Sequence, residues 1–109
     1  MSYDDEWPDM TWENRKTMVR KTIRPATREE LRKLGEERFP VVTDPWCIRY
    51  NEFLSAHPEG SYYRAEIPEH AEIIYSREAD RGVWFLPGKG MGILQPKGRE
   101  IMADAVDAL

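Results

Sequence analysis

Hydrophobic residues recur with the period of an α-helix most clearly between Asp44 and about His57. Their spacing of i, i+1, i+4, i+7, i+8 and i+11 is that of one helical face, shared by Trp46, Cys47, Tyr50, Phe53, Leu54 and His57. Asp44 is a favourable N-cap, and Pro45 suits the first helical position. Residues 58–60, Pro-Glu-Gly, then end the helix, so the pattern predicts an amphipathic helix with one buried face.

Two further segments carry helical signals. Thr27 and Glu30 have the spacing of a capping box, which opens a helix that continues to about Arg38. Gly35 is a candidate for an early C-terminal cap of this helix. Pro96 opens a last helix, whose predicted apolar face consists of Ile101, Met102, Ala105, Val106 and Leu109.

Alternation with a period of two predicts β-strands. The first strand covers Thr17 to Arg24, with Val19 and Ile23 on one side, and Pro25 ends it because proline has no amide hydrogen for a continuing ladder. Three more strands are expected to form a meander over residues 61–67, 71–76 and 83–86. Residues 77–82 are predicted to be the hairpin loop between the last two strands.

Residues 1–14 show neither period. They contain five acidic and no basic residues, together with Tyr3, Trp7, Met10 and Trp12. We interpret them as a flexible acidic N-terminal arm, and residues 15–109 as a single domain. The predicted order is β-α-α-β-β-β-α, an α+β fold with a small antiparallel sheet and helices packed on one face.

The composition narrows the class of protein. The chain has 109 residues, 40% hydrophobic and 33% charged, which is typical of one small soluble domain. No apolar run approaches the roughly 20 residues of a membrane span, and the acidic N-terminus does not resemble a secretory signal. One cysteine and two histidines do not supply a disulfide framework or a usual zinc ligand set. We therefore expect a cytoplasmic protein without metal or cofactor.

The charge is distributed unevenly. The net charge is −4, which argues against general binding of nucleic acid, yet residues 15–38 carry nine bases and four acids. Within them, Arg20 and Arg24 would share one strand face. Three interpretations of this basic face are open: a contact with RNA or an acidic protein, an edge strand protected by charge, or a docking surface for the acidic arm. We favour the arm over nucleic acid, within one chain or in a homodimer.

The segment Gly88-Lys89-Gly90-Met91-Gly92 forms a predicted glycine-rich loop. Glycines at alternate positions let a backbone approach a ligand closely, and Lys89 would add positive charge. The pattern departs from a P-loop, because Gly90 stands where Ser or Thr should follow the lysine. The segment is therefore either a connector, a lid, or an anion or ligand site.

Several single residues are further candidates for a functional role. His57 lies on an apolar helical stripe and Cys47 lies on the same stripe, so both are expected to be structural. His70 is a candidate general base. Trp84 and Phe85 point to opposite faces of one strand, so at least one must be covered by a helix, by the arm or by another protein.

Three functions remain open. The first is a binding module of inhibitor or immunity type, whose partner is a protein or a second copy of the chain. The second follows from the element order, which is similar to that of the small ribosome-dependent ribonuclease toxins of bacterial toxin–antitoxin pairs. That similarity implies RNA cleavage, with His70 or a carboxylate as base and phosphate held by Arg64, Arg77, Arg81 and Lys89. The third is a ligand-binding domain in which residues 88–92 close over a pocket lined by Trp84 and Tyr63.

Overall fold

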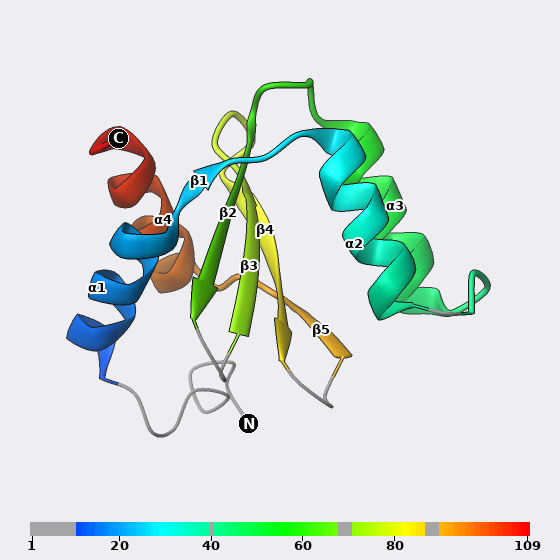
Figure 1. Cartoon of the computed structure of the whole chain (residues 1–109), viewed down its shortest axis with the longest axis horizontal. Coiled ribbons are helices and arrows are strands. Elements are labelled where there is room, and N and C mark those ends of the chain that lie inside the picture. The colour runs from blue at the N-terminus through cyan, green and yellow to red at the C-terminus, as the bar shows by residue number, and fades with distance from the viewer. Residues whose placement is uncertain (1–10, 40, 68–70, 87–89) are drawn as a thin grey trace.

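The computed structural model describes residues 11–39, 41–67, 71–86 and 90–109. Within these ranges the helices are α1 (Trp12–Thr22), α2 (Arg28–Arg38), α3 (Pro45–Ala56) and α4 (Pro96–Asp107). The strands are β1 (Arg24–Pro25), β2 (Tyr62–Ile67), β3 (Ala71–Ser76), β4 (Arg81–Leu86) and β5 (Gly90–Ile93). All neighbouring strands are antiparallel, in the order β1-β2-β3-β4-β5 (Figure 1). The α+β class and the antiparallel sheet are confirmed.

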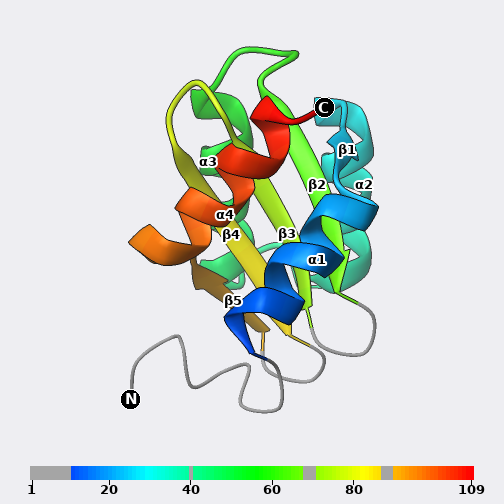
Figure 2. The same cartoon turned by 90° about the vertical axis from the view of Figure 1, so that its left-hand side faces the viewer.

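Helices cover both faces of this sheet. α1 and α4 lie on one side and α2 and α3 on the other (Figures 1 and 2). The expectation that all helices pack on one face is wrong, because the central strand β3 is buried on both sides. Ile73 belongs to the core beneath α1 and α4, and its neighbour Ile74 belongs to the core beneath α2 and α3. A strand that is apolar on two faces needs a helical layer on each.

The first predicted strand is mostly a helix. α1 occupies most of residues 17–24, and only Arg24 and Pro25 pair with β2. Thr11 is the N-cap, and its hydroxyl accepts a hydrogen bond from the amide of Asn14 at 3.1 Å. Val19 is buried on α1, so it belongs to the buried face of a helix and not to one side of a strand. Of the proposed arm, residues 12–14 form the first turn of α1, and residues 1–10 lie outside the described part of the chain.

The helices α2 and α3 form where the sequence predicts them. Thr27 and Asp44 are the two N-caps, with side chains that accept from the amides of Glu30 and Trp46. Gly35 does not end α2, which continues to Arg38. A Cβ atom at position 35 would lie 2.6 Å from the ring of Tyr50 on α3, so the missing side chain makes room for close helix packing.

The meander β2-β3-β4 is confirmed, but residues 90–93 form a strand where a glycine-rich loop was expected. β5 pairs with β4 in the register Val83↔Ile93 and Phe85↔Met91. Gly92 is required there, because a Cβ atom would lie 2.1 Å from the ring of Trp84. Residues 87–89 lie outside the described ranges.

Trp84 and Phe85 do lie on opposite faces of β4, and the chain itself buries both. Trp84 is part of the core under α1 and α4. Phe85 packs against Tyr50, with ring centroids 5.3 Å apart, in the core under α2 and α3. Only 5% of Trp84 and 4% of Phe85 is exposed. Among the described helices, none has both the length and the apolar character needed to cross a bilayer.

Candidate functional site

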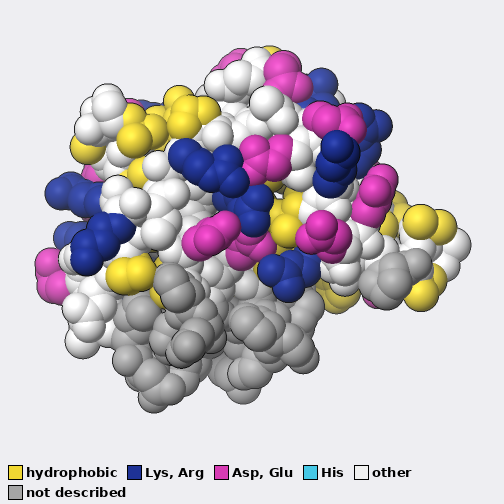
Figure 3. All heavy atoms as spheres, in the orientation of Figure 1, with side chains coloured by type: hydrophobic (Ala, Val, Ile, Leu, Met, Phe, Trp, Pro, Cys, Tyr) yellow, Lys and Arg dark blue, Asp and Glu magenta, His cyan; other side chains and the backbone are white. Residues whose placement is uncertain are grey.

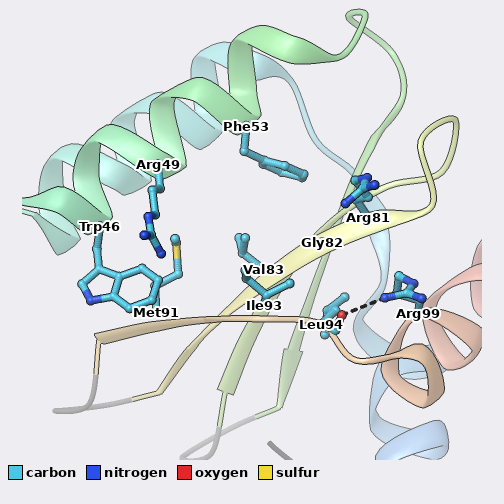
Figure 4. Close-up of a pocket in the computed structure, with 10 residues that line it drawn as sticks. All are labelled: Trp46, Arg49, Phe53, Arg81, Gly82, Val83, Met91, Ile93, Leu94 and Arg99. Atoms are coloured by element: carbon cyan, nitrogen blue, oxygen red, sulfur yellow. Dashed lines mark hydrogen bonds between the residues drawn. The ribbon is translucent and has the colours of Figure 1, made fainter.

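A cleft of about 330 Å³ lies between α3 and the β4-β5 end of the sheet (Figure 4). It is lined by Trp46, Arg49 and Phe53 from α3, Arg81, Gly82 and Val83 from β4, Met91, Ile93 and Leu94 from β5 and the residue after it, and Arg99 from α4. We call this the α3–β5 cleft. Its volume is at the lower end of the range of small-ligand pockets.

The apolar wall of the cleft follows from the two periodicities that meet there. Trp46, Arg49 and Phe53 are spaced i, i+3 and i+7, so they project from one side of α3. Val83 is paired with Ile93, and their side chains therefore share the sheet face that α3 covers. Ile93 nevertheless keeps 49% of its surface exposed. The cleft thus presents an accessible apolar surface beside the sheet edge.

Three guanidinium groups border this apolar surface. Arg49 stacks on Trp46, with its Cζ atom 5.1 Å from the ring centroid. Arg99 donates from Nη1 to the carbonyl of Leu94 at 3.1 Å. Arg81 projects from the start of β4 toward the same space (Figure 4). Within the described residues, no ion pair joins Arg49 or Arg81 to a carboxylate.

The position of Arg99 is set by a contact outside the cleft. Its Nε atom lies 3.8 Å from Oδ2 of Asp80, in the turn between β3 and β4. Asp80 has φ of 52°, a left-handed conformation that aspartate tolerates better than most residues. It also accepts a hydrogen bond from the hydroxyl of Tyr75. Burial, together with this bond to Asp80, raises the pKa of Tyr75. The turn therefore places a carboxylate beside Arg99 at the end of the cleft.

The lining residues define what the cleft can do. Guanidinium groups bind carboxylate, sulfate and phosphate through paired hydrogen bonds. None of the ten lining residues is acidic, and none is a histidine, cysteine, serine or tyrosine. The described lining residues therefore include groups that hold an anion and an apolar moiety, but none of them is suited to proton transfer near neutral pH or to nucleophilic attack.

Arg64, a candidate phosphate ligand, belongs to a different cluster. Its guanidinium lies 2.9 Å from Glu30 and 3.2 Å from Glu66, and it also contacts the buried carboxylate of Glu72. Only 17% of the Arg64 side chain is exposed. Hydrogen bonds from Arg24 and then Arg64 lower the pKa of Glu30. Figure 3 shows basic and acidic side chains interleaved over the middle of the face that it draws. Arg64 is therefore committed to ion pairs within the chain.

Arg20 and Arg24 do not share a strand face. Arg20 is exposed on α1, whereas Arg24 lies in β1 and forms a double hydrogen bond with Glu30 at 3.1 and 2.6 Å. The basic segment 15–38 is divided among α1, β1 and α2, because residues 15–22 belong to a helix and not to the predicted strand. It does not form the single basic face that the strand prediction implied.

The structure describes only part of the predicted glycine-rich loop. Gly90, Met91 and Gly92 belong to β5, and Met91 lines the cleft, whereas Gly88 and Lys89 lie outside the described residues. Trp84 and Tyr63 belong to the core on the opposite sheet face, so they do not line this cleft.

Of the catalytic candidates, Arg81 lies in the cleft and His70 falls outside the described residues. Arg77 pairs with Asp107 at 3.2 Å. Cys47 is buried, and the His57 ring packs on Phe53 with centroids 5.0 Å apart. Among the candidates that the structure describes, no two side chains meet in a catalytic group.

The cleft residues Arg49, Phe53, Ile93 and Arg99 were not expected to act together. For the residues on α3 the sequence did indicate a common side of the helix, because Arg49 stands three residues after Trp46 and four before Phe53. The approach of α3 to β5 and α4, which are far away in the sequence, carried no such signal. Comparison with protein-family models, with curated proteins and with solved structures finds no match, so the geometry of the cleft has to carry the functional argument.

Proposed function

We propose that this chain is a non-catalytic binding module, which holds an anionic, partly apolar part of a protein partner in the α3–β5 cleft. One observation carries the proposal: Arg49, Arg81 and Arg99 surround an apolar surface, and none of its described lining residues is acidic. The chain as a whole has a net charge of −4, so this cluster is opposite in sign to the average surface. A local cluster of this kind selects partners by complementary charge.

The same features favour binding over RNA cleavage. Arg64 is neutralised by carboxylates, and no lining residue in the described part of the chain would serve as a general base. The negative net charge also opposes the approach of a polyphosphate chain. Self-association is a variant of the proposal, in which acidic residues within positions 1–10 of a second copy would be the partner segment.

The test uses an anionic fluorophore with an apolar body, 8-anilino-1-naphthalenesulfonate. We expect saturable binding to the full chain, weakened at least about tenfold by Arg49→Glu or Arg81→Glu, which corresponds to about 1.4 kcal/mol. Arg20→Glu is the matched control, because it makes the same charge change on the exposed surface of α1. The affinity of the Arg20→Glu variant should stay close to that of the original chain.

A neutral analogue separates charge from apolar contact. N-phenyl-1-naphthylamine lacks the sulfonate, so its binding should be insensitive to both cleft substitutions. Far-UV circular dichroism and thermal unfolding confirm that each variant is folded. Equal binding of the sulfonate by all three variants would refute the proposal, because the arginines would then contribute nothing to recognition.

A further inference from the structure

The strand β5 forms an edge of the sheet, and β4 is its partner in the ladder. The amide of Leu94, directly after β5, donates to the carbonyl of Gly82 at 2.9 Å. Backbone groups of an antiparallel strand alternate in direction, so the N–H and C=O groups of Met91 and Ile93 point away from β4. No described segment pairs with this outer side of β5.

The two edges of the sheet differ in their protection. Natural edge strands are usually shielded by proline, by charged side chains or by shortness. The β1 edge has all three, because it contains two residues, Arg24 and Pro25, and Arg24 is paired with Glu30. The β5 edge, Gly90-Met91-Gly92-Ile93, has neither a proline nor a charge. Among the described residues, neither a pairing strand nor a proline or charge of its own blocks this edge against pairing with another extended chain.

The α3–β5 cleft lies beside this open edge. In Figure 4, Arg49 projects from α3 next to Met91, whereas Arg99 lies next to Leu94 at the other end of β5. Arg81 lies toward that same end, at the start of β4. A strand added to β5 would run about 4.8 Å from it and would turn every second side chain toward α3. Those side chains would meet apolar surface in the middle and guanidinium groups toward both ends.

We propose that β5 binds an extended acidic peptide segment of a partner protein by strand addition. Backbone hydrogen bonds to Met91 and Ile93 would supply part of the affinity, and acidic side chains facing the arginines would supply selectivity. Pairing of the β5 edges of two copies is disfavoured, because it would bring their arginine clusters together. The inference rests on the proposed function, since it assigns the occupant of the same cleft.

The test selects peptides from a library of random dodecapeptides displayed on phage. The full chain is the target, and the double variant Arg49→Glu/Arg81→Glu is the counter-target. We expect the enriched peptides to carry net negative charge and to bind the double variant at least tenfold more weakly, whereas Arg20→Glu retains them. Enrichment of neutral or basic peptides, or failure to enrich any, would overturn the acidic-peptide assignment.

Two further measurements examine the edge itself. Hydrogen exchange should show that a selected peptide protects the amides of Met91 and Ile93. Ile93→Pro removes an outward amide that β4 does not use, so it should weaken peptide binding at least tenfold, whereas Ile93→Ala keeps that amide and should lose less. Binding without protection of these amides would refute strand addition. If the sulfonate still binds the cleft but no peptide protects β5, strand addition fails and the cleft proposal stands.

Discussion

Gly35→Ala is the substitution for which helix propensity and tertiary packing predict opposite signs. Gly35 lies within α2, where alanine is favoured over glycine by about 1 kcal/mol. Propensity alone therefore predicts that the substitution stabilises the protein. In the structure, the new Cβ atom would lie 2.6 Å from Cε2 and 2.8 Å from Cδ2 of Tyr50.

The Tyr50 ring has little freedom to move away. Carbon atoms in contact normally lie about 3.5–4.0 Å apart, so the ring would have to retreat by about 1 Å. Tyr50 is fully buried, its hydroxyl donates to the carbonyl of Leu31 at 2.6 Å, and its ring packs against Phe85 and Phe39. Overpacking of this kind costs about 1–3 kcal/mol, and the strained hydrogen bond adds about 1 kcal/mol. After subtraction of the propensity gain of about 1 kcal/mol, the net expectation is a loss of about 1–3 kcal/mol.

Urea unfolding followed by far-UV circular dichroism measures this loss as a lower midpoint at an unchanged slope. A thermal midpoint lower by roughly 4–8 °C for each kcal/mol is expected. Lys33→Ala, on the exposed surface of the same helix, is the control and should change stability by less than about 0.5 kcal/mol. In a Tyr50→Leu background the loss of stability caused by Gly35→Ala should become smaller or change sign, because the ring that the new Cβ atom meets is absent. A Gly35→Ala protein more stable than the original chain would refute the reasoning.

Two further predictions concern the ion pairs around α2. Glu72→Gln should destabilise the fold by about 1–3 kcal/mol, because the buried carboxylate of Glu72 lies against Arg64. Glu29→Gln is the control: Glu29 is exposed, so the substitution should cost less than about 0.5 kcal/mol. Equal urea midpoints for the two variants would contradict this prediction. Arg24 lowers the pKa of Glu30, so the stabilisation by this carboxylate is present above the unfolded pKa of about 4.3 and is lost as pH falls through the folded pKa. The stability advantage over Glu30→Gln should therefore shrink below about pH 4, and an advantage that stays constant to about pH 3 would contradict the assignment.

The helix α3 shows what local sequence can determine. Asp44, Pro45 and the apolar stripe that ends near His57 specify its start, its buried face and its end, and these signals lie within fourteen consecutive residues. The helices α2 and α4 and the meander of β2, β3 and β4 were likewise predictable. In each of these elements the signal lies within a few residues of the chain: a cap for α2, Pro96 and an apolar helical face for α4, and alternation for the strands.

The segments α1 and β5 were mispredicted because their local signals were ambiguous. Residues 17–24 fit a strand by alternation, and α1 becomes evident only from its cap at Thr11, within the stretch interpreted as an arm. The glycines of β5 suggested a loop, whereas Gly92 is needed to admit the ring of Trp84. The second case depends on a packing contact from a neighbouring strand, which no local pattern reports.

By itself, the sequence determined the α+β class, most of the helices and strands, and the two opposite faces of β4. Caps, turns and periodicity act over short distances, so they are readable along the chain. The tertiary structure alone decided that helices cover both sheet faces, that Arg64 is neutralised by carboxylates, and that Arg49, Arg81 and Arg99 surround one cleft. These features depend on which distant elements approach one another, because packing and charge pairing act through space.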